Sequence, residues 1–289
     1  MESLGKVIFD SLVAHSRNNY EEGDYIDSEG FLCCGKCHTR KEFEITLPEG
    51  FGQEHVKRVG VVCQCKKEEM EKEKAARERE EFNRRMIMLQ KDGITDPAYL
   101  RYTFDNDDMR NPEVSQVCRK YVENWDEMFK DNIGILFYGG VGTGKSFLAC
   151  CIANALIEKL VPVSVTNFPR ILNKLQGFGF GEERQEFIDK LQRYKLLVID
   201  DLGVERDTSY STEQVYNVID TRSRSGMPLI ITTNLSMDDL KNPPSLGHAR
   251  IYDRVLEMCP IRLKLVGESR RTTIANERRD KAKKLLGLK

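Results

Sequence analysis

The sequence has no apolar run of about 18 residues or more, the length that a membrane-spanning helix requires. It also has almost no net charge, because its 45 Lys and Arg residues are balanced by 46 Asp and Glu residues. Global charge therefore singles out neither a nucleic-acid-binding nor an acid-binding protein, and any electrostatic steering must come from local patches. The first residues, among them Glu2 and Asp10, lack the regions of a secretory signal. We therefore expect a cytoplasmic protein with no membrane partner.

Nine cysteines in a reducing compartment argue against disulfides and favour metal binding or simple burial. Four of them form two close pairs: Cys34 with Cys37, and Cys63 with Cys65. Such pairs can bring four thiolates to the corners of a tetrahedral Zn²⁺ site. The second pair is C-x-C, so the match to a zinc ribbon is incomplete, and Cys33 and His38 are alternative ligands. We expect structural zinc rather than redox or buried cysteines, because a segment of about 60 residues needs a cross-link and four thiolates leave no position for catalysis.

A glycine-rich segment lies between an apolar, β-prone run at residues 133–138 and a run of helical character at 147–153. It follows the pattern G-x-x-x-x-G-K-S and consists of Gly139, Gly140, Val141, Gly142, Thr143, Gly144, Lys145 and Ser146. Glycines let the backbone approach a phosphate closely, and the amino end of the next helix attracts the same anion. Lys145 is placed to bind the β- and γ-phosphates and Ser146 to bind Mg²⁺. The segment is a P-loop and predicts binding of a nucleoside triphosphate.

Two further apolar runs end in polar side chains. Residues 195–201 predict a buried strand that ends in Asp200 and Asp201. Its carboxyl end emerges beside the P-loop in a parallel sheet. We therefore expect Asp200 to hold Mg²⁺, directly or through water, and Asp201 to orient the attacking water. The strand predicted over 229–234 ends in Asn234, which can position the same water; its alternative role is to cap the helix predicted over 237–241, for which Ser236 is the better candidate.

The remaining pattern divides the chain into three parts. Residues 1–66 form a cysteine module with an amphipathic helix expected over 5–16. Residues 67–98 form a charged linker, helical from about 66 to 90, whose interleaved acids favour a solvated helix over a nucleic-acid-binding one. It ends at Gly93 and Pro97, where we expect a hinge. Residues 99–289 form an α/β domain with a strand at 162–166 and helices at 111–131, 168–176, 182–194, around 250–255 and at the basic C-terminus.

The order of these motifs is that of a known family. With the P-loop, Asp200-Asp201, Thr232-Thr233-Asn234 and Arg250-Ile251-Tyr252-Asp253-Arg254, residues from about 100 to 289 resemble AAA+ ATPases of the DnaC/IstB class. The cysteine module, with Asp24-Tyr25-Ile26 and Cys34-Gly35-Lys36-Cys37, and the charged helix resemble bacterial and phage helicase loaders of the DnaC/DnaI type. The resemblance implies a parallel sheet flanked by helices, with ATP, Mg²⁺ and Zn²⁺ as cofactors. It also implies partners: a replicative DnaB-type hexameric helicase, single-stranded DNA, and further copies of the chain in a hexamer or spiral.

The resemblance also assigns roles to single residues. Asn234 corresponds to sensor 1, Arg254 to an arginine finger that acts on the neighbouring subunit's ATP, with Arg250 beside it, and Arg271 of G-E-S-x-R to sensor 2. Many AAA+ proteins carry Asp-Glu where this chain carries Asp-Asp, and the shorter carboxylate predicts slow, switch-like hydrolysis. The alternative for the two arginines is a surface helix with salt bridges to Asp253 or Glu257.

Three functions fit these motifs. The first is a loader that delivers the helicase onto single-stranded DNA, the second an IstB-type transposition helper ATPase, and the third a nucleotide-dependent adaptor or inhibitor that captures the helicase without loading it. The cysteine module favours the first. The family implies that helices before Asp200 face the DNA strand, and the candidate contacts, with core packing as their alternative, are Phe168, Phe178, Phe180, Arg170, Lys174 and Arg184.

Overall fold

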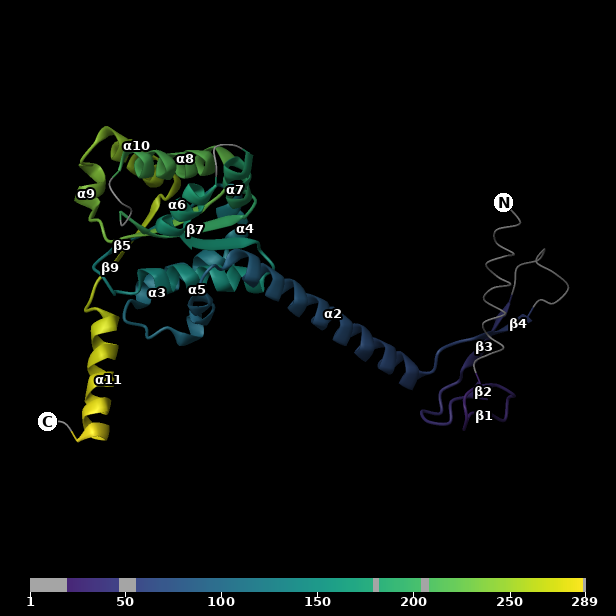
Figure 1. Ribbon diagram of the computed structural model, residues 1–289. Helices are drawn as coiled ribbons and strands as arrows, with labels where there is room; N and C mark the ends of the chain where they lie inside the picture. Colours follow the sequence, from purple (N-terminus) through teal and green to yellow (C-terminus); the bar gives the residue numbers. More distant parts are fainter. Residues whose placement is uncertain (1–19, 47–55, 179–181, 204–207, 288–289) are drawn as a thin grey trace. The chain divides into compact units, whose positions relative to one another are not determined.

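The computed structural model describes residues 20–46, 56–178, 182–203 and 208–287 (Figure 1). The chain divides into two compact units, Met1–Asn83 and Arg84–Lys289. The helix expected over 5–16 and the candidate DNA contact Phe180 lie outside the described residues. Within the described part, no helix combines the length and the apolar character needed to cross a membrane.

The amino-terminal unit contains two small antiparallel sheets. The first pairs β1 (Tyr25–Ile26) with β2 (Leu32–Cys33), and the second pairs β3 (Glu42–Thr46) with β4 (Val56–Gly60). A buried ion pair lies beside them, with Lys41 Nζ 2.6 Å from Asp24 Oδ2 and both side chains at most 3% exposed. The hydrogen bond from Lys41 lowers the pKa of Asp24 to about 2. This pair ties the residues before β1 to the segment after the first cysteine pair.

The charged linker forms a single helix, α2 (Gln64–Gly93), which confirms the prediction for residues 66–90 and extends it at both ends. Glu73 and Arg77, one turn apart on this helix, form an i,i+4 ion pair at 3.6 Å. Glycine is required at its last residue, because a Cβ on Gly93 would lie 1.9 Å from the carbonyl oxygen of Val163. The helix therefore ends where the backbone meets the sheet of the second unit.

The second unit contains a five-stranded parallel sheet in the order β6-β7-β8-β5-β9. The strands are β5 (Ile135–Gly139), β6 (Val163–Asn167), β7 (Leu196–Leu202), β8 (Leu229–Thr233) and β9 (Ile261–Leu265). Alternate residues of β5 enter different cores: Ile135 and Phe137 pack in one, and Leu136 packs in the other. Both faces of the sheet are therefore buried, as continuous apolar strands require.

Helices cover both faces of this sheet (Figure 1). One face carries α3 (Pro112–Glu123), α4 (Trp125–Lys130) and α5 (Lys145–Glu158). The other carries α6 (Phe168–Gly177), α7 (Glu182–Gln192), α8 (Ser209–Ser225), α9 (Met237–Lys241) and α10 (Leu246–Met258), and α11 (Arg270–Leu286) follows β9. Two 3₁₀ helices, η1 (Pro97–Arg101) and η2 (Phe104–Asn106), precede α3. The sheet with helices on both faces is the α/β architecture expected from the sequence.

Three elements differ from the sequence expectation. The helix predicted over 111–131 is interrupted at Asn124 and forms two helices, α3 and α4. Helix α8 and strand β9 were not predicted. Helix α8 is rich in Ser and Thr, which are weak helix formers, and it is held by its few apolar residues against α10 and the sheet. Strand β9 is short and half-exposed, so its apolar pattern is weak.

Arg222 of α8 is fully buried. Its guanidinium donates hydrogen bonds to the carbonyl oxygens of Tyr194, Lys195 and Pro228, which precede β7 and β8. Burial lowers the pKa of Arg222 to about 9. The side chain thus fixes α8 to the amino ends of β7 and β8, whereas the P-loop lies at the carboxyl ends of the strands.

Candidate nucleotide site

The P-loop joins β5 to α5 through three residues in the left-handed region. Gly139, Gly142 and Gly144 have φ values of 136°, 77° and 106°. Residues with a side chain rarely adopt these backbone angles, so glycine is required there. Thr143 closes the turn, since its hydroxyl donates to the carbonyl oxygen of Gly140 at 2.9 Å. The backbone N–H groups at the amino end of α5 therefore point into the loop, where they can bind an anion such as a phosphate.

Lys145, the first residue of α5, is only 4% exposed. Its Nζ donates to the carbonyl oxygens of Gly139 and Gly140 at 3.0 and 2.8 Å, and to Oδ1 of Asn234 at 2.8 Å. Burial lowers the pKa of Lys145, and the charge of nearby Asp201 opposes that shift. The ammonium group is thus held at the P-loop by partners from two strand ends.

A cavity of about 270 Å³ adjoins the P-loop. It collects side chains from the P-loop, from the ends of β7 and β8, and from the segments before α3 and at the start of α11. Its lining consists of Tyr102, Val141, Gly142, Gly144, Lys145, Ser146, Phe147, Asp201, Asn234, Arg270 and Arg271. Ser146, Asp201, Asn234 and Arg271, which the sequence predicts for one site, therefore lie around one cavity.

The two carboxylates at the end of β7 point to different surroundings. Pairing between β7 and β8 is irregular between Ile199 and Leu202, and Asp201 has a φ of 60°. Asp201 lines the cavity, and burial followed by the charge of Asp200 raises its pKa. Asp200 is 6% exposed and accepts hydrogen bonds from the hydroxyls of Thr232 at 2.5 Å and Tyr99 at 3.2 Å. With the Ser146 hydroxyl, these carboxylates provide the oxygen ligands that Mg²⁺ prefers.

Arg270, which the sequence analysis did not identify, contacts the P-loop directly. Its guanidinium donates to the carbonyl oxygen of Thr143, and its backbone N–H donates to the carbonyl oxygen of Gly142 at 2.9 Å. A Cβ on Gly144 would collide with the Arg270 guanidinium. The predicted Arg271 lines the same cavity. The only sequence signal for Arg270 is that it precedes Arg271 in the same motif; for Tyr99 there is no such signal.

Arg254 lies on α10 and is absent from the lining of its own chain's cavity. Its side chain is 40% exposed and forms ion pairs with Glu257 at 2.9 Å and with Asp220 of α8 at 3.6 Å. Glu257 is a partner that the sequence analysis considered, whereas Asp220 was not identified. Arg250, one turn earlier, is exposed.

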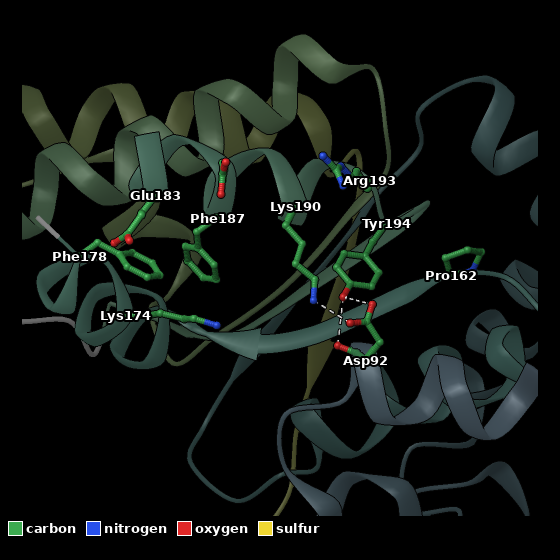
Figure 2. A pocket seen from close by; sticks show the side chains of 10 residues that line it. Asp92, Pro162, Lys174, Phe178, Glu183, Phe187, Lys190, Arg193 and Tyr194 are labelled. Atoms are coloured by element: carbon green, nitrogen blue, oxygen red, sulfur yellow. Dashed lines mark hydrogen bonds and ion pairs between the residues drawn. The ribbon is translucent and has the colours of Figure 1, made fainter. Parts of the chain in front are cut away.

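A larger cavity of about 790 Å³ lies between α6, α7 and the end of α2, within the second unit (Figure 2). Lys174 Nζ lies 4.9 Å from the ring centre of Phe187, whose ring centre is 5.9 Å from that of Phe178. The lining of this cavity consists of Asp92, Pro162, Lys174, Phe178, Glu183, Glu186, Phe187, Lys190, Arg193 and Tyr194. Two of the candidate DNA contacts, Lys174 and Phe178, thus share one opening.

Three further candidate DNA contacts that the structure describes, Phe168, Arg170 and Arg184, are buried or bonded within the protein. Phe168 is 0% exposed, so the suggestion that it contacts DNA is wrong: it packs in the same hydrophobic core as Leu197 and Ile199 of β7. Arg170 donates to the carbonyl oxygen of Thr95 at 2.7 Å, and Arg184 donates to the carbonyl oxygen of Leu175 at 3.1 Å.

The four paired cysteines of the amino-terminal unit lie together. The sulfur atoms of Cys34, Cys37, Cys63 and Cys65 are all within 4.8 Å of one another. Four thiolates around Zn²⁺ at about 2.3 Å would be about 3.8 Å apart, so the cluster fits a tetrahedral site. Cys33 does not belong to this cluster, and its Sγ lies 3.8 Å from Asp27 Oδ2. The geometry thus selects among the sulfur ligands that the sequence left open.

Comparisons with known proteins agree with this arrangement. The chain is 28% identical over 183 residues to the replicative helicase loader DnaI of Bacillus subtilis, covering 58% of each protein. It is 30% identical over 141 residues to the replicative helicase loader DnaC of Escherichia coli K12, covering 48% of this chain and 55% of DnaC. The chain therefore spans little more than half the length of these relatives.

Solved structures show the same fold at low identity. The crystal structure of DnaI has a TM-score of 0.52 and 22% identity, covering 62% of this chain and 95% of that one. The crystal structure of the DnaC helicase loader has a TM-score of 0.50 and 21% identity, covering 59% and 100%. The model of the family described as IstB-like ATP binding protein matches residues 65–278, which is most of the chain and includes the whole P-loop site. The chain belongs to the IstB-like ATP-binding protein family.

Proposed function

We propose that this protein is an ATP-dependent helicase loader. It binds ATP and Mg²⁺ at the P-loop cavity, hydrolyses ATP slowly, and uses the nucleotide state to deliver a replicative DnaB-type hexameric helicase onto single-stranded DNA. The observation that carries the proposal is that Lys145 at the start of α5, Asp201 of β7 and Asn234 after β8 meet around one cavity. Two relatives named as replicative helicase loaders support it.

The residues of the cavity divide the work of hydrolysis. Lys145 exchanges its carbonyl acceptors for β- and γ-phosphate oxygens, and Ser146 and Asp200 hold Mg²⁺, which neutralises phosphate charge when bound. Asp201 orients the attacking water. Its pKa is raised toward neutral pH, and a general base is most effective when its pKa lies near the working pH. Asn234 positions the same water, and Arg271 adds positive charge at the phosphates.

The rest of the chain supplies partner binding. Residues 1–66, held together by Zn²⁺ on the four clustered cysteines, bind the helicase, and residues 67–98 link this module to the ATPase domain at 99–289. Copies of the ATPase domain assemble into a hexamer or spiral in which Arg254 reaches the neighbour's ATP.

Single-stranded DNA binds at the cavity between α6 and α7 (Figure 2). The rings of Phe178 and Phe187 provide stacking surfaces for bases, and Lys174 provides a charge for phosphate. Aromatic rings beside a base are the arrangement that proteins use to hold a single strand without reading its sequence.

The test titrates the purified chain against a replicative hexameric helicase, with and without ATP and single-stranded DNA. Native mass spectrometry counts the subunits, and strand displacement by a helicase that cannot load itself measures loading. We expect Lys145→Ala to abolish ATP-dependent loading, and Lys241→Ala, which changes an exposed lysine of α9, to leave it intact. Loading that survives Lys145→Ala would overturn the ATP switch. Helicase capture without strand displacement identifies an adaptor or inhibitor, and assembly on duplex DNA with a transposase identifies a transposition helper.

A further inference from the structure

The segment that follows α2 is bonded to the edge of the parallel sheet. Ile94 pairs in parallel with Val165 of β6, and the Thr95 hydroxyl donates to the carbonyl oxygen of Val165 at 2.9 Å. Arg170 of α6 donates to the carbonyl oxygen of Thr95 at 2.7 Å. These bonds fix the backbone just before η1, where the sequence alone suggests a hinge.

Helix η1 is also attached to α5, the helix that begins with Lys145. Asn154 of α5 is 5% exposed, and its Nδ2 donates to the carbonyl oxygens of both Tyr99 and Tyr102 at 2.8 Å. The rings of Tyr99 and Tyr102 are 5.8 Å apart, and Tyr102 lines the P-loop cavity. One buried amide therefore sets the position of η1 relative to the nucleotide site.

Tyr99 extends from η1 to the end of β7. Its hydroxyl donates to Oδ2 of Asp200 at 3.2 Å, while the Thr232 hydroxyl donates to Oδ1 of the same carboxylate at 2.5 Å. Each carboxylate oxygen has a second lone pair, so both remain able to bind Mg²⁺ or a water on Mg²⁺. Donors on both oxygens orient a carboxylate, as outer-shell partners do around bound metals.

We infer that Tyr99 is a positioning residue for Asp200, and that through it the segment 94–102 controls the affinity of the nucleotide site for Mg²⁺. The inference rests on the proposed function, in which Asp200 holds Mg²⁺. Displacement of η1, for example when a partner pulls on the preceding helix, withdraws the Tyr99 hydroxyl and leaves Asp200 held by Thr232 alone. The metal is then bound more weakly while the P-loop is unchanged.

The test measures binding of a fluorescent ATP analogue as Mg²⁺ is titrated. Tyr99→Phe removes the hydroxyl and keeps the ring. We expect it to raise the Mg²⁺ concentration for half-maximal effect on the order of tenfold, the scale of outer-shell mutations, and to leave nucleotide affinity in EDTA unchanged. Tyr121→Phe is the matched control, because it removes a hydroxyl that donates to the carbonyl oxygen of Ile133 at 2.7 Å. An Mg²⁺ requirement that is the same in Tyr99→Phe and wild type overturns the inference.

A double-mutant cycle tests the connection to η1. Asn154→Ala releases the carbonyl oxygens of Tyr99 and Tyr102 and keeps the Tyr99 hydroxyl. If Asn154 acts through Tyr99, the double variant requires no more Mg²⁺ than Tyr99→Phe alone; independent effects multiply and overturn the connection. Failure of the proposed function has a different signature, because the wild-type protein would then show no Mg²⁺-dependent nucleotide binding.

Discussion

The guanidinium of Arg270 binds the carboxylate of Asp108 at two points, with Nε 2.8 Å from Oδ2 and Nη2 2.5 Å from Oδ1. Arg270 begins α11 and also donates to the carbonyl oxygen of Thr143 in the P-loop, while Asp108 lies shortly before α3. The pair therefore joins the start of α11 to the segment before α3, beside the nucleotide cavity.

This pair makes stability depend on pH. The hydrogen bond from Arg270 lowers the pKa of Asp108 to about 2 from 3.8. A lowered carboxyl pKa contributes stability that is present above the unfolded-state pKa and is lost as pH falls through the folded-state pKa. We expect Asp108→Asn to reduce the free energy of unfolding at pH 7 by less than about 1 kcal/mol, because the carboxylate is 39% exposed. The difference from wild type should vanish between pH 4 and pH 2.

Urea unfolding at pH 7, 5, 3 and 2 measures this difference. Asp105→Asn, an exposed carboxylate of η2, is the control and should show no such trend. A difference for Asp108→Asn that stays constant over the whole pH range would contradict the assignment to the Arg270 ion pair.

Metal content should follow the cysteine cluster. We expect about one Zn²⁺ per chain in the wild-type protein, retention in Cys33→Ser, and loss in Cys65→Ser. Cys65 Sγ lies 3.4 Å from Cys63 Sγ and 3.6 Å from Cys34 Sγ, whereas Cys33 faces Asp27. Elemental analysis of the purified variants provides the measurement. Zinc at the wild-type level in Cys65→Ser would exclude Cys65 as a ligand.

Arg254 should act on a neighbouring subunit. We expect Arg254→Ala to slow ATP hydrolysis in the assembled protein by on the order of 10³-fold, the lower range for arginine fingers supplied by a neighbour. Arg224→Ala is the matched control, because Arg224 also pairs with Asp220 and is 77% exposed. Mixing Arg254→Ala chains with Asp201→Asn chains should restore part of the activity, since each provides what the other lacks. Absence of rescue would place Arg254 in a structural role on its own chain.

Binding of single-stranded DNA should depend on the cavity between α6 and α7. We expect Phe187→Ala to weaken binding by about 1–3 kcal/mol, the range for one stacked base. Lys174→Ala should reduce the salt dependence of binding by about one phosphate contact. Arg119→Ala provides the control, because Arg119 lies over the ring of Phe104 at 4.7 Å on α3. Fluorescence anisotropy with a labelled oligonucleotide at several salt concentrations measures both the affinity and its salt dependence. If neither changes in these variants, single-stranded DNA does not bind at this cavity.

Local patterns were sufficient for the parts of the fold that are encoded locally. The strand, glycine loop and helix around Lys145 are contiguous, and three of the four loop glycines, Gly139, Gly142 and Gly144, stand where φ is positive. The charged run from 66 to 90 predicted α2, since uninterrupted good helix formers with i,i+4 ion pairs favour a helix without tertiary support. The spacing of the cysteines likewise predicted the four that converge.

Tertiary structure decided everything that depends on residues distant in sequence. The sequence placed Asp200 and Asp201 side by side, but the irregular pairing of β7 with β8 gives them different surroundings: Asp201 lines the cavity, and Asp200 is bonded to Thr232 and Tyr99. No pattern in the sequence links Tyr99 to Asp200, or separates Arg270 from Arg271. These contacts depend on strand order, register and side-chain packing between residues that are 31 to 127 positions apart in sequence, and such interactions leave no periodic signal in the chain.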